Sequence, residues 1–368
     1  MTTTATATGT RGSALGSLRT GLGRLVGRVT TPLLPADYLD VIDPLLATNP
    51  LRGRIVGVHP ETRDAATLVI RPGRGWRGHV PGQYLRLGVD VDGVRHWRSY
   101  SLTSRAKRAD GCLSITVKAV PGGVVSNHLV RRAVIGDIVH LDLPAGGFTL
   151  GTPLPAKILF VTAGSGITPV IGMLRNLPPG AHADIVVVHS APSADGVVFG
   201  GELRILARRG LIRLVEIHTG TGGRLDRARL SEMVDDLHER HTWACGPSGL
   251  LEMVENHWES AGIGDRLHTE RFRPALIAPG EGGTVRFAAT GTVVETGGSQ
   301  SLLDAGEAAG VLMPSGCRMG ICFGCVASLR RGAVRDLRSG ELTVAAEGDN
   351  VIVQTCISGA AGDCDIDL

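Results

Sequence analysis

The stretch PSGCRMGICFGC, residues 314–325, brings three of the chain's seven cysteines into nine residues. Cys317, Cys322 and Cys325 are separated by four and then two residues, and Cys356 follows after a further 30. A pair of bridged irons needs four thiolates, which a loop of three cysteines and a distant fourth can supply. The spacing therefore predicts a [2Fe–2S] cluster held by these four cysteines.

Three glycines of the same loop would let backbone N–H groups approach the cluster: Gly316, Gly320 and Gly324. Four cysteines could instead hold a zinc ion, but zinc sites usually combine two Cys-x2-Cys pairs, and the first interval here has four residues. Cys364 is an alternative fourth ligand that fits the spacing less well. Thiols this crowded indicate ligands rather than a disulfide framework, so we expect a reducing, cytoplasmic location.

The cysteine loop and the later VIVQTCIS, residues 351–358, together resemble the plant-type [2Fe–2S] ferredoxin module. This resemblance implies an α+β, β-grasp-like ferredoxin domain. We assign it residues 284–368, preceded by a Pro/Gly-rich linker at 276–283.

Composition limits what the rest of the chain can be. Its 368 residues suggest two or three domains, and 43% apolar with 20% charged residues exclude a wholly disordered protein. A net charge of +3 argues against a nucleic-acid partner. The sequence has no run of 18 apolar residues and no secretory signal.

Residues 50–152 consist of short β-type runs between Gly, Pro and Asp turns, which predicts a small antiparallel barrel. It contains the sequence RSYS at positions 98–101. Arg98 can neutralise a phosphate, the ring of Tyr100 can cover a flavin, and the Ser101 hydroxyl can hydrogen-bond the flavin N5. The barrel is therefore a candidate flavin-binding domain.

A Gly-Gly-x-x-Ser segment follows in the same region and would offer backbone N–H groups to the flavin phosphates at the start of a helix. Its candidate binding residues are Gly122, Gly123 and Ser126.

Residues 153–275 alternate strand-like and helix-like runs, which predicts an open α/β domain with a parallel sheet. A glycine loop follows its first strand, and Thr168 is expected to cap the next helix. The start of that helix would face the pyrophosphate of a nicotinamide dinucleotide. The candidate residues of this loop are Gly164, Ser165, Gly166, Thr168 and Pro169.

The end of the second strand of this domain would face the nucleotide ribose, where an acid favours NADH and a cation favours NADPH. No acid occurs there before Asp195, whereas Ser190, Ser193 and Arg224 could hold a 2′-phosphate. We therefore expect NADPH as the donor, with NADH as the alternative.

Taken together, residues 50–368 resemble the ferredoxin reductase superfamily, in the order flavin barrel, nucleotide domain, ferredoxin. This resemblance implies FAD rather than FMN. It also places Cys245, with Gly246 and Pro247, and Glu270 beside the nicotinamide. With Ser101, Cys245 and Glu270 are the candidate catalytic residues.

The resemblance further implies an electron-transfer reductase that serves a terminal oxygenase or a membrane-bound fatty-acid desaturase. Soluble ring-hydroxylating dioxygenases, other monooxygenases and cytochromes P450 are alternative acceptors. A non-catalytic redox sensor or a zinc-stapled binding protein is the alternative from another class.

Residues 1–49 lie outside the resemblance and form a basic leader and linker, with arginines at 11, 19, 24 and 28 and the first acid at Asp37. Within this leader, residues 13–29 carry apolar side chains at three- and four-residue spacing. This pattern fits a segment that lies peripherally on an anionic membrane, with a disordered leader and an organelle transit peptide as the alternatives.

Overall fold

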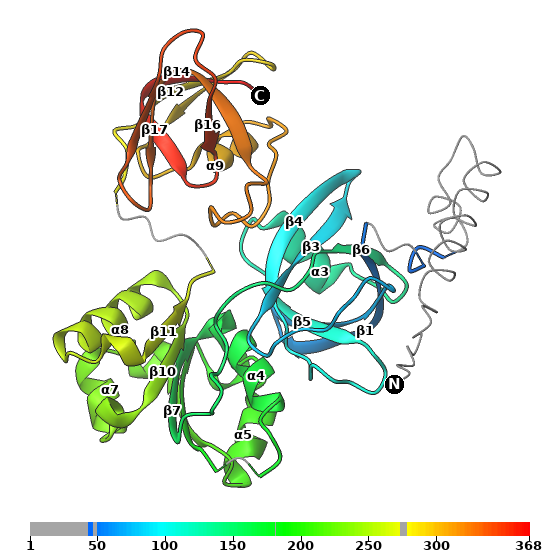
Figure 1. The fold of residues 1–368 in the computed structure, drawn as a ribbon, viewed down its shortest axis with the longest axis vertical. Helices are drawn as coiled ribbons and strands as arrows, with labels where there is room; N and C mark the ends of the chain where they lie inside the picture. The colour runs from blue at the N-terminus through cyan, green and yellow to red at the C-terminus, as the bar shows by residue number, and fades with distance from the viewer. Residues whose placement is uncertain (1–42, 47–49, 181, 273–277) are drawn as a thin grey trace, which may run out of the picture.

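The structure is a computed structural model that describes residues 43–46, 50–180, 182–272 and 278–368. The predicted leader segment 13–29 lies outside the described residues. Three sheets follow one another along the chain, each in its own domain (Figure 1). The predicted multidomain fold class, with a barrel, an open α/β domain and an α+β domain, is confirmed.

The first domain is a six-stranded antiparallel sheet in the order β4-β3-β6-β1-β2-β5. A bridge between Leu102 and Ile115 links the end of β4 to β5 and closes the barrel. Alternate side chains of these strands fill its interior. Its elements are β1 (Arg52–Thr62), β2 (Ala65–Pro72), β3 (Tyr84–Val91), β4 (Val94–Ser101), β5 (Leu113–Lys118), α3 (Val124–Arg131) and β6 (Ile138–Leu141).

The second domain is a five-stranded parallel sheet in the order β11-β10-β7-β8-β9. Strands β7 and β8 are apolar along most of their length because the sheet is buried on both faces. Its strands are β7 (Lys157–Ala163), β8 (Asp184–Ala191), β9 (Arg213–His218), β10 (His241–Cys245) and β11 (Leu267–Glu270). Its α-helices are α4 (Ile167–Arg175), α5 (Gly200–Arg208), α6 (Thr219–Gly222), α7 (Arg227–Met233) and α8 (Ser248–Ser260), and its 3-10 turns are η1 (Gly164–Gly166), η2 (Ala194–Gly196), η3 (Leu237–Glu239) and η4 (Gly264–Arg266).

The third domain is a mixed sheet in the order β13-β12-β17-β14-β15, with β16 paired to β14 and α9 packed on the same core. Strands β12 and β17 are parallel neighbours, whereas the other pairs are antiparallel. Its elements are β12 (Gly283–Phe287), β13 (Thr292–Thr296), α9 (Leu302–Ala308), β14 (Val326–Asp336), β15 (Leu342–Ala345), β16 (Val351–Gln354) and β17 (Ser358–Ile366).

The arrangement of the domains positions the site. The loop between α9 and β14, which carries three of the candidate cluster cysteines, reaches down toward strands β3 and β4 of the barrel (Figure 1). No helix in the described part of the chain is long and apolar enough to cross a membrane.

Candidate functional site

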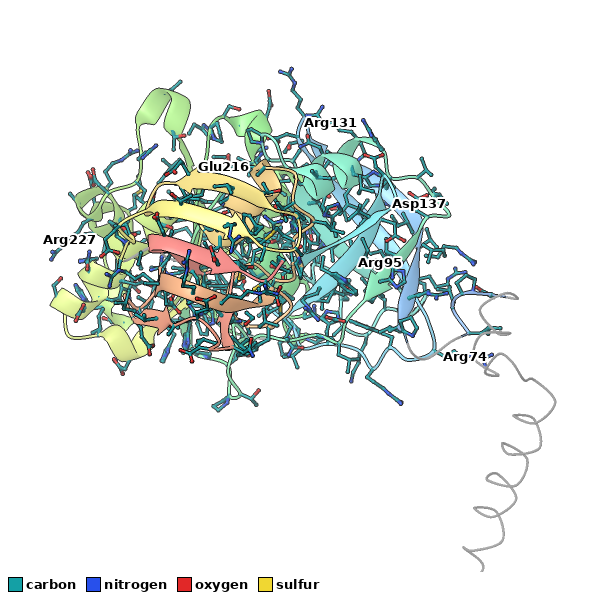
Figure 2. All side chains as sticks on the ribbon, turned by 90° about the horizontal axis from the view of Figure 1, so that it is seen from above. Arg74, Arg95, Arg131, Asp137, Glu216 and Arg227 are labelled. Atoms are coloured by element: carbon teal, nitrogen blue, oxygen red, sulfur yellow. The ribbon has the colours of Figure 1, made fainter. Side chains whose placement is uncertain are left out.

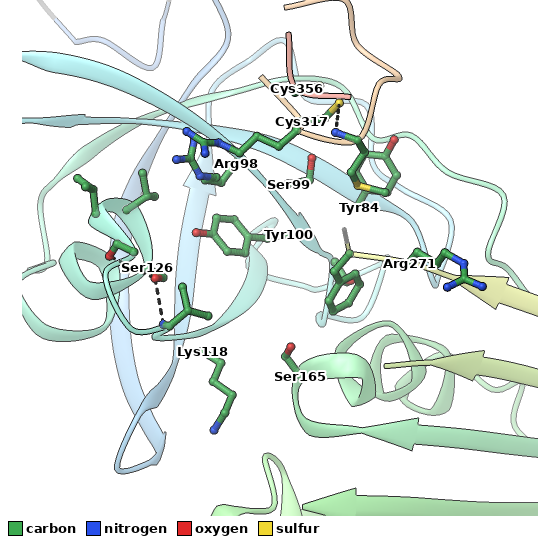
Figure 3. A pocket seen from close by; sticks show the side chains of 18 of the residues that line it. Tyr84, Arg98, Ser99, Tyr100, Lys118, Ser126, Ser165, Arg271, Cys317 and Cys356 are labelled. Atoms are coloured by element: carbon green, nitrogen blue, oxygen red, sulfur yellow. Dashed lines mark hydrogen bonds between the residues drawn. The ribbon is translucent and has the colours of Figure 1, made fainter. Parts of the chain in front are cut away.

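A cavity of about 670 Å³ lies where the three domains meet. The barrel contributes the RSYS residues and the start of α3, while the nucleotide domain contributes Ser165, Thr168 and Glu270. The ferredoxin domain contributes Cys317 and Cys356. One space therefore joins residues that the sequence assigns separately to flavin, nucleotide and cluster (Figure 3).

Strand β4 positions the flavin candidates. In the β3–β4 ladder Ser101 lies opposite Tyr84, and Tyr100 lies opposite Leu85. The Ser101 hydroxyl is buried and has no hydrogen-bond partner among the described residues. A buried hydroxyl without a partner is costly, so this atom fits a site where a ligand supplies the bond. Burial also raises the pKa of Tyr100, which keeps its ring neutral.

The start of α3 forms the opposite wall of the same cavity. Gly123 is the N-cap and leaves the first turn without a side-chain cap. The Ser126 hydroxyl instead accepts from the Val120 N–H at 3.2 Å, which fixes the turn before the helix (Figure 3). The first-turn N–H groups therefore have no side-chain cap, as at helix starts that bind phosphates, and Lys118, ion-paired with Asp64 at 2.6 Å, lines the same cavity.

The nucleotide loop differs from the sequence prediction at one residue. Gly164–Gly166 form the turn η1, and α4 begins at Ile167 with Gly166 as its N-cap. Thr168 therefore lies inside the first turn and does not cap the helix, and its hydroxyl donates to the Ser165 carbonyl at 2.9 Å. The prediction of a Thr168 cap was wrong because the helix begins earlier than its sequence suggests. The uncapped end of α4 is better suited to a phosphate.

Cys245 and Glu270 lie side by side at the ends of parallel strands. They are register partners in the β10–β11 pair, and Cys245 also pairs with Thr162 of β7. Burial raises the pKa of Glu270 to about 8, and one of its carboxyl oxygens has no hydrogen-bond partner among the described residues. The neutral acid faces the cavity, whereas Cys245 is packed in the core behind it.

The three residues predicted near the ribose lie around the carboxyl end of β8. Ser190 is buried, and its hydroxyl lacks a hydrogen-bond partner among the described residues. Ser193 and Arg224 are exposed. The short helix α6 is held close by the hydrogen bond from the Gly220 N–H to the Pro192 carbonyl. Two acids also lie at this end of the sheet: Glu216 is the register partner of His189 and is ion-paired with Arg204, and the exposed Asp195 follows Ser193 by two residues.

The four cluster candidates form two pairs rather than one convergent group. The Cys325 thiol lies 3.1 Å from the Cys356 sulfur, and the Cys317 N–H donates to the Cys322 sulfur at 3.1 Å. The Gly324 N–H also donates to Cys322, at 3.4 Å. Within the described ranges no three or more metal-ligating side chains gather tightly enough to hold a single ion. Two thiol pairs with N–H donors fit two irons better than one zinc.

The titration of the thiols agrees with this pairing. The hydrogen bond between the two thiols lowers the pKa of Cys325 to about 6 and raises the pKa of Cys356, so Cys325 loses its proton first. Burial raises the pKa of Cys364 to about 12, and its strand β17 lies within the domain core. Cys364 therefore stays a protonated core residue.

Several lining residues were not predicted from sequence, although two of them had a signal. Tyr84 directly follows the Pro-Gly-Gln turn, and Phe272 follows Glu270 by two residues. Tyr84 lies where the domains meet, because it interacts electrostatically with Cys317, Cys322 and Glu270.

Arg86 had no such signal, since it is one polar position in an ordinary strand. It ion-pairs with Asp142 and stacks over Trp97 at 5.5 Å. Its guanidinium also interacts with the Cys322 sulfur, so the barrel touches the cluster loop directly.

Comparisons with known proteins agree with this geometry. Residues 64–150 match the oxidoreductase FAD-binding domain family, and residues 287–360 match the 2Fe-2S iron-sulfur cluster binding domain family. The chain is 50% identical to an NADPH oxidoreductase of Mycobacterium tuberculosis, over 94% of this chain and 92% of the relative. It is 31% identical to a glycine betaine monooxygenase reductase subunit of Pseudomonas aeruginosa, over 78% of this chain and 86% of the relative.

Among solved structures, phthalate dioxygenase reductase aligns with a TM-score of 0.58 at 24% identity, over 86% of this chain and 97% of that one. That likeness supports the order and fold of the three domains. The chain belongs to the ferredoxin-reductase-type oxidoreductases that join an FAD-binding domain to a C-terminal [2Fe–2S] domain.

Proposed function

We propose that this protein oxidises NADPH, collects the electrons on FAD and passes them through its [2Fe–2S] cluster to an oxygenase-type acceptor. The observation that carries the proposal is the single cavity lined by residues of all three domains. Bound FAD accepts two electrons as a hydride, and the cluster carries one electron at a time. A cavity that all three domains share supports the proposal, because electrons must pass from donor to flavin to cluster within one chain.

In this proposal each wall has a task. Ser101 donates a hydrogen bond to the flavin ring, and Tyr100 covers the ring face. Arg98, largely buried at the same wall, balances the phosphate charge. Glu270 stays neutral at physiological pH, so it can donate a hydrogen bond to the nicotinamide amide without repelling a hydride.

The donor is proposed to be NADPH on two grounds. Ser190, Ser193 and Arg224 are polar or cationic where an acid would select NADH. The M. tuberculosis relative at 50% identity is named an NADPH oxidoreductase.

The acceptor is proposed to be a terminal oxygenase, because a relative at 31% identity is named the reductase subunit of a monooxygenase. Among all oxygen-activating acceptors, including those that are not oxygenases, we favour a membrane-bound fatty-acid desaturase, which the basic leader would suit. Soluble ring-hydroxylating dioxygenases, other monooxygenases and cytochromes P450 are the alternatives.

The test compares two electron acceptors and two donors on the purified protein. Ferricyanide accepts electrons from the flavin, whereas cytochrome c requires the cluster. The proposal expects both activities, at least about tenfold higher kcat/KM with NADPH than with NADH, and loss of the cytochrome c activity alone in Cys322→Ser. Colourless protein with zinc and no flavin would instead favour the zinc-stapled binding protein, and a preference for NADH would overturn the donor assignment.

A further inference from the structure

Three aliphatic side chains are exposed close together on the outer edge of the barrel. Val134, Ile135 and Ile138 have 59%, 69% and 36% of their surface exposed, in a stretch of five residues that follows α3 and ends on the first residue of β6. Clustered exposed aliphatic groups mark interaction surfaces far more often than scattered ones do.

Arginines lie on both sides of this group. Ile138 is the register partner of Arg54, and Arg54 is the register partner of Arg71, so the three side chains form one outward row across β6, β1 and β2. Arg131 and Arg132 stand exposed at the other side, at the end of α3. We call Val134, Ile135 and Ile138, with Arg71, Arg74, Arg131 and Arg132, the outer patch. Figure 2 shows Arg131, Asp137 and Arg74 along this edge, away from the nucleotide domain.

Two acids lie near the outer patch, and one of them is paired with an arginine. The carboxylate of Asp137 accepts from the Val134 N–H at 2.9 Å. Asp43 pairs with Arg54 at 2.9 Å. A backbone N–H does not neutralise a carboxylate, so the outer patch combines four arginines with the one carboxylate of Asp137 and is net positive.

The basic N-terminal segment starts from this same edge. Besides the Asp43–Arg54 pair, the Arg74 N–H donates to the carbonyl of the buried Leu45 at 3.2 Å. The sequence before Asp43 carries arginines at 11, 19, 24 and 28 and its only acids at Asp37 and Asp40. The sequence of the leader and the outer patch are both basic, so both suit one anionic partner.

We propose that the outer patch is a docking surface for an anionic lipid bilayer. Its aliphatic side chains enter the headgroup region while its arginines contact lipid phosphates, which is the arrangement of interfacial membrane-binding surfaces. The proposal goes beyond electron transfer and holds whichever acceptor the cluster serves.

Co-sedimentation of the full chain with vesicles tests the proposal. The vesicles are phosphatidylcholine alone or phosphatidylcholine with about one third phosphatidylglycerol. An arginine near an anionic surface contributes about fivefold to binding, so the double variant Arg131→Glu, Arg132→Glu should bind the anionic vesicles at least about tenfold more weakly. Ile135→Ser should weaken binding by about threefold through lost apolar contact.

The nucleotide domain offers a matched control. Arg208 and Arg209 are exposed at the end of α5, beside the exposed Leu211, but far from the leader's starting point. Arg208→Glu, Arg209→Glu should bind anionic vesicles within about twofold of the unaltered chain. If both double variants lost vesicle binding equally, binding would depend on the total charge of the protein and not on the outer patch, which would overturn the proposal. Unaltered binding of the outer-patch variant would leave the leader as the sole anchor and would also overturn it.

The same two double variants show whether a loss of vesicle binding comes from misfolding or from a loss of electron transfer. Neither arginine pair lines the cavity, so both variants should keep the NADPH-dependent ferricyanide activity. A failure of the proposed electron transfer would remove that activity from the unaltered chain as well, without changing vesicle binding.

Discussion

The cluster loop, residues 314–325, and the nucleotide loop, residues 163–169, both need glycine because other atoms lie very close to the backbone. In the cluster loop these atoms are close in the sequence, whereas in the nucleotide loop they are distant in the sequence. A Cβ on Gly316 would lie 2.4 Å from the Cys322 sulfur, within the same loop. A Cβ on Gly166 would lie 2.0 Å from the Cys245 carbonyl, on strand β10, which follows two intervening strands, β8 and β9. The cluster loop is therefore shaped by its own ligands, whereas the nucleotide loop is shaped by the sheet around it. The cluster loop can therefore be recognised as a sequence motif, whereas the shape of the nucleotide loop depends on tertiary packing.

The largest effect is expected when a predicted cluster ligand is removed. Cys356→Ser should abolish cluster absorbance and the EPR signal after dithionite reduction, because one iron loses a thiolate, while the flavin stays bound. The matched variant Cys364→Ala, which removes a protonated core thiol, should keep the full signal. Loss of the signal in Cys364→Ala together with its retention in Cys356→Ser would reassign the fourth ligand.

The next effect lies in the nucleotide loop. Gly166→Ala forces a methyl group into the Cys245 carbonyl, and such overpacking against backbone costs about 1–3 kcal/mol. We expect a KM for NADPH raised at least about tenfold, measured by steady-state kinetics, with cluster EPR unchanged. Gly249→Ala in α8 meets no atom within 4 Å and should behave as the unaltered protein. Equal KM values in the two variants would show that close packing does not shape this loop.

In the cluster loop the same substitution should do less. Gly316→Ala meets the Cys322 sulfur and the end of the Arg86 side chain, and the side chain can shift. We expect iron content per chain to fall by about half, with KM for NADPH unchanged. Gly297→Ala in the same domain has open space around it and is the control. A raised KM in Gly316→Ala would contradict the separation of the two loops.

The last effect concerns the buried acid beside the nucleotide loop. Because the folded-state pKa of Glu270 is raised to about 8, its favourable contribution to stability is complete below its ordinary pKa and is lost as the pH rises toward 8. Glu270→Gln cannot ionise, so it should be more stable than the unaltered protein at pH 9 by about 4 kcal/mol and within about 1 kcal/mol of it at pH 5. Urea unfolding at both pH values measures this. A pH-independent difference would mean that Glu270 titrates normally.

The sequence predicts most of the site where residues act within one segment. The RSYS residues, the Gly-Gly-x-x-Ser turn and two of the cluster cysteines, Cys317 and Cys356, line one cavity, because a strand or a loop presents a short motif as a unit. The order of the three domains can also be predicted, because each motif lies in a region with its own pattern of strand-like and helix-like segments.

The rest depends on contacts between distant segments. The exact start of α4 decides that Thr168 does not cap it, and helix boundaries are weakly encoded in a single sequence. Sheet packing decides that Cys245 lies behind Glu270 rather than in the cavity wall. Arg86 reaches the cluster loop only because the ferredoxin domain contacts β3. The local sequence YLRL, residues 84–87, carries no signal that predicts this contact.

An anaerobic titration of the purified protein with NADPH, followed by absorbance and EPR, tests the shared cavity most directly. FAD takes two electrons and the cluster one, so full reduction should consume about 1.5 NADPH per chain, and the cluster EPR signal should develop without any added mediator. An endpoint at about one NADPH per chain, with the cluster still oxidised, would contradict electron transfer between the two centres.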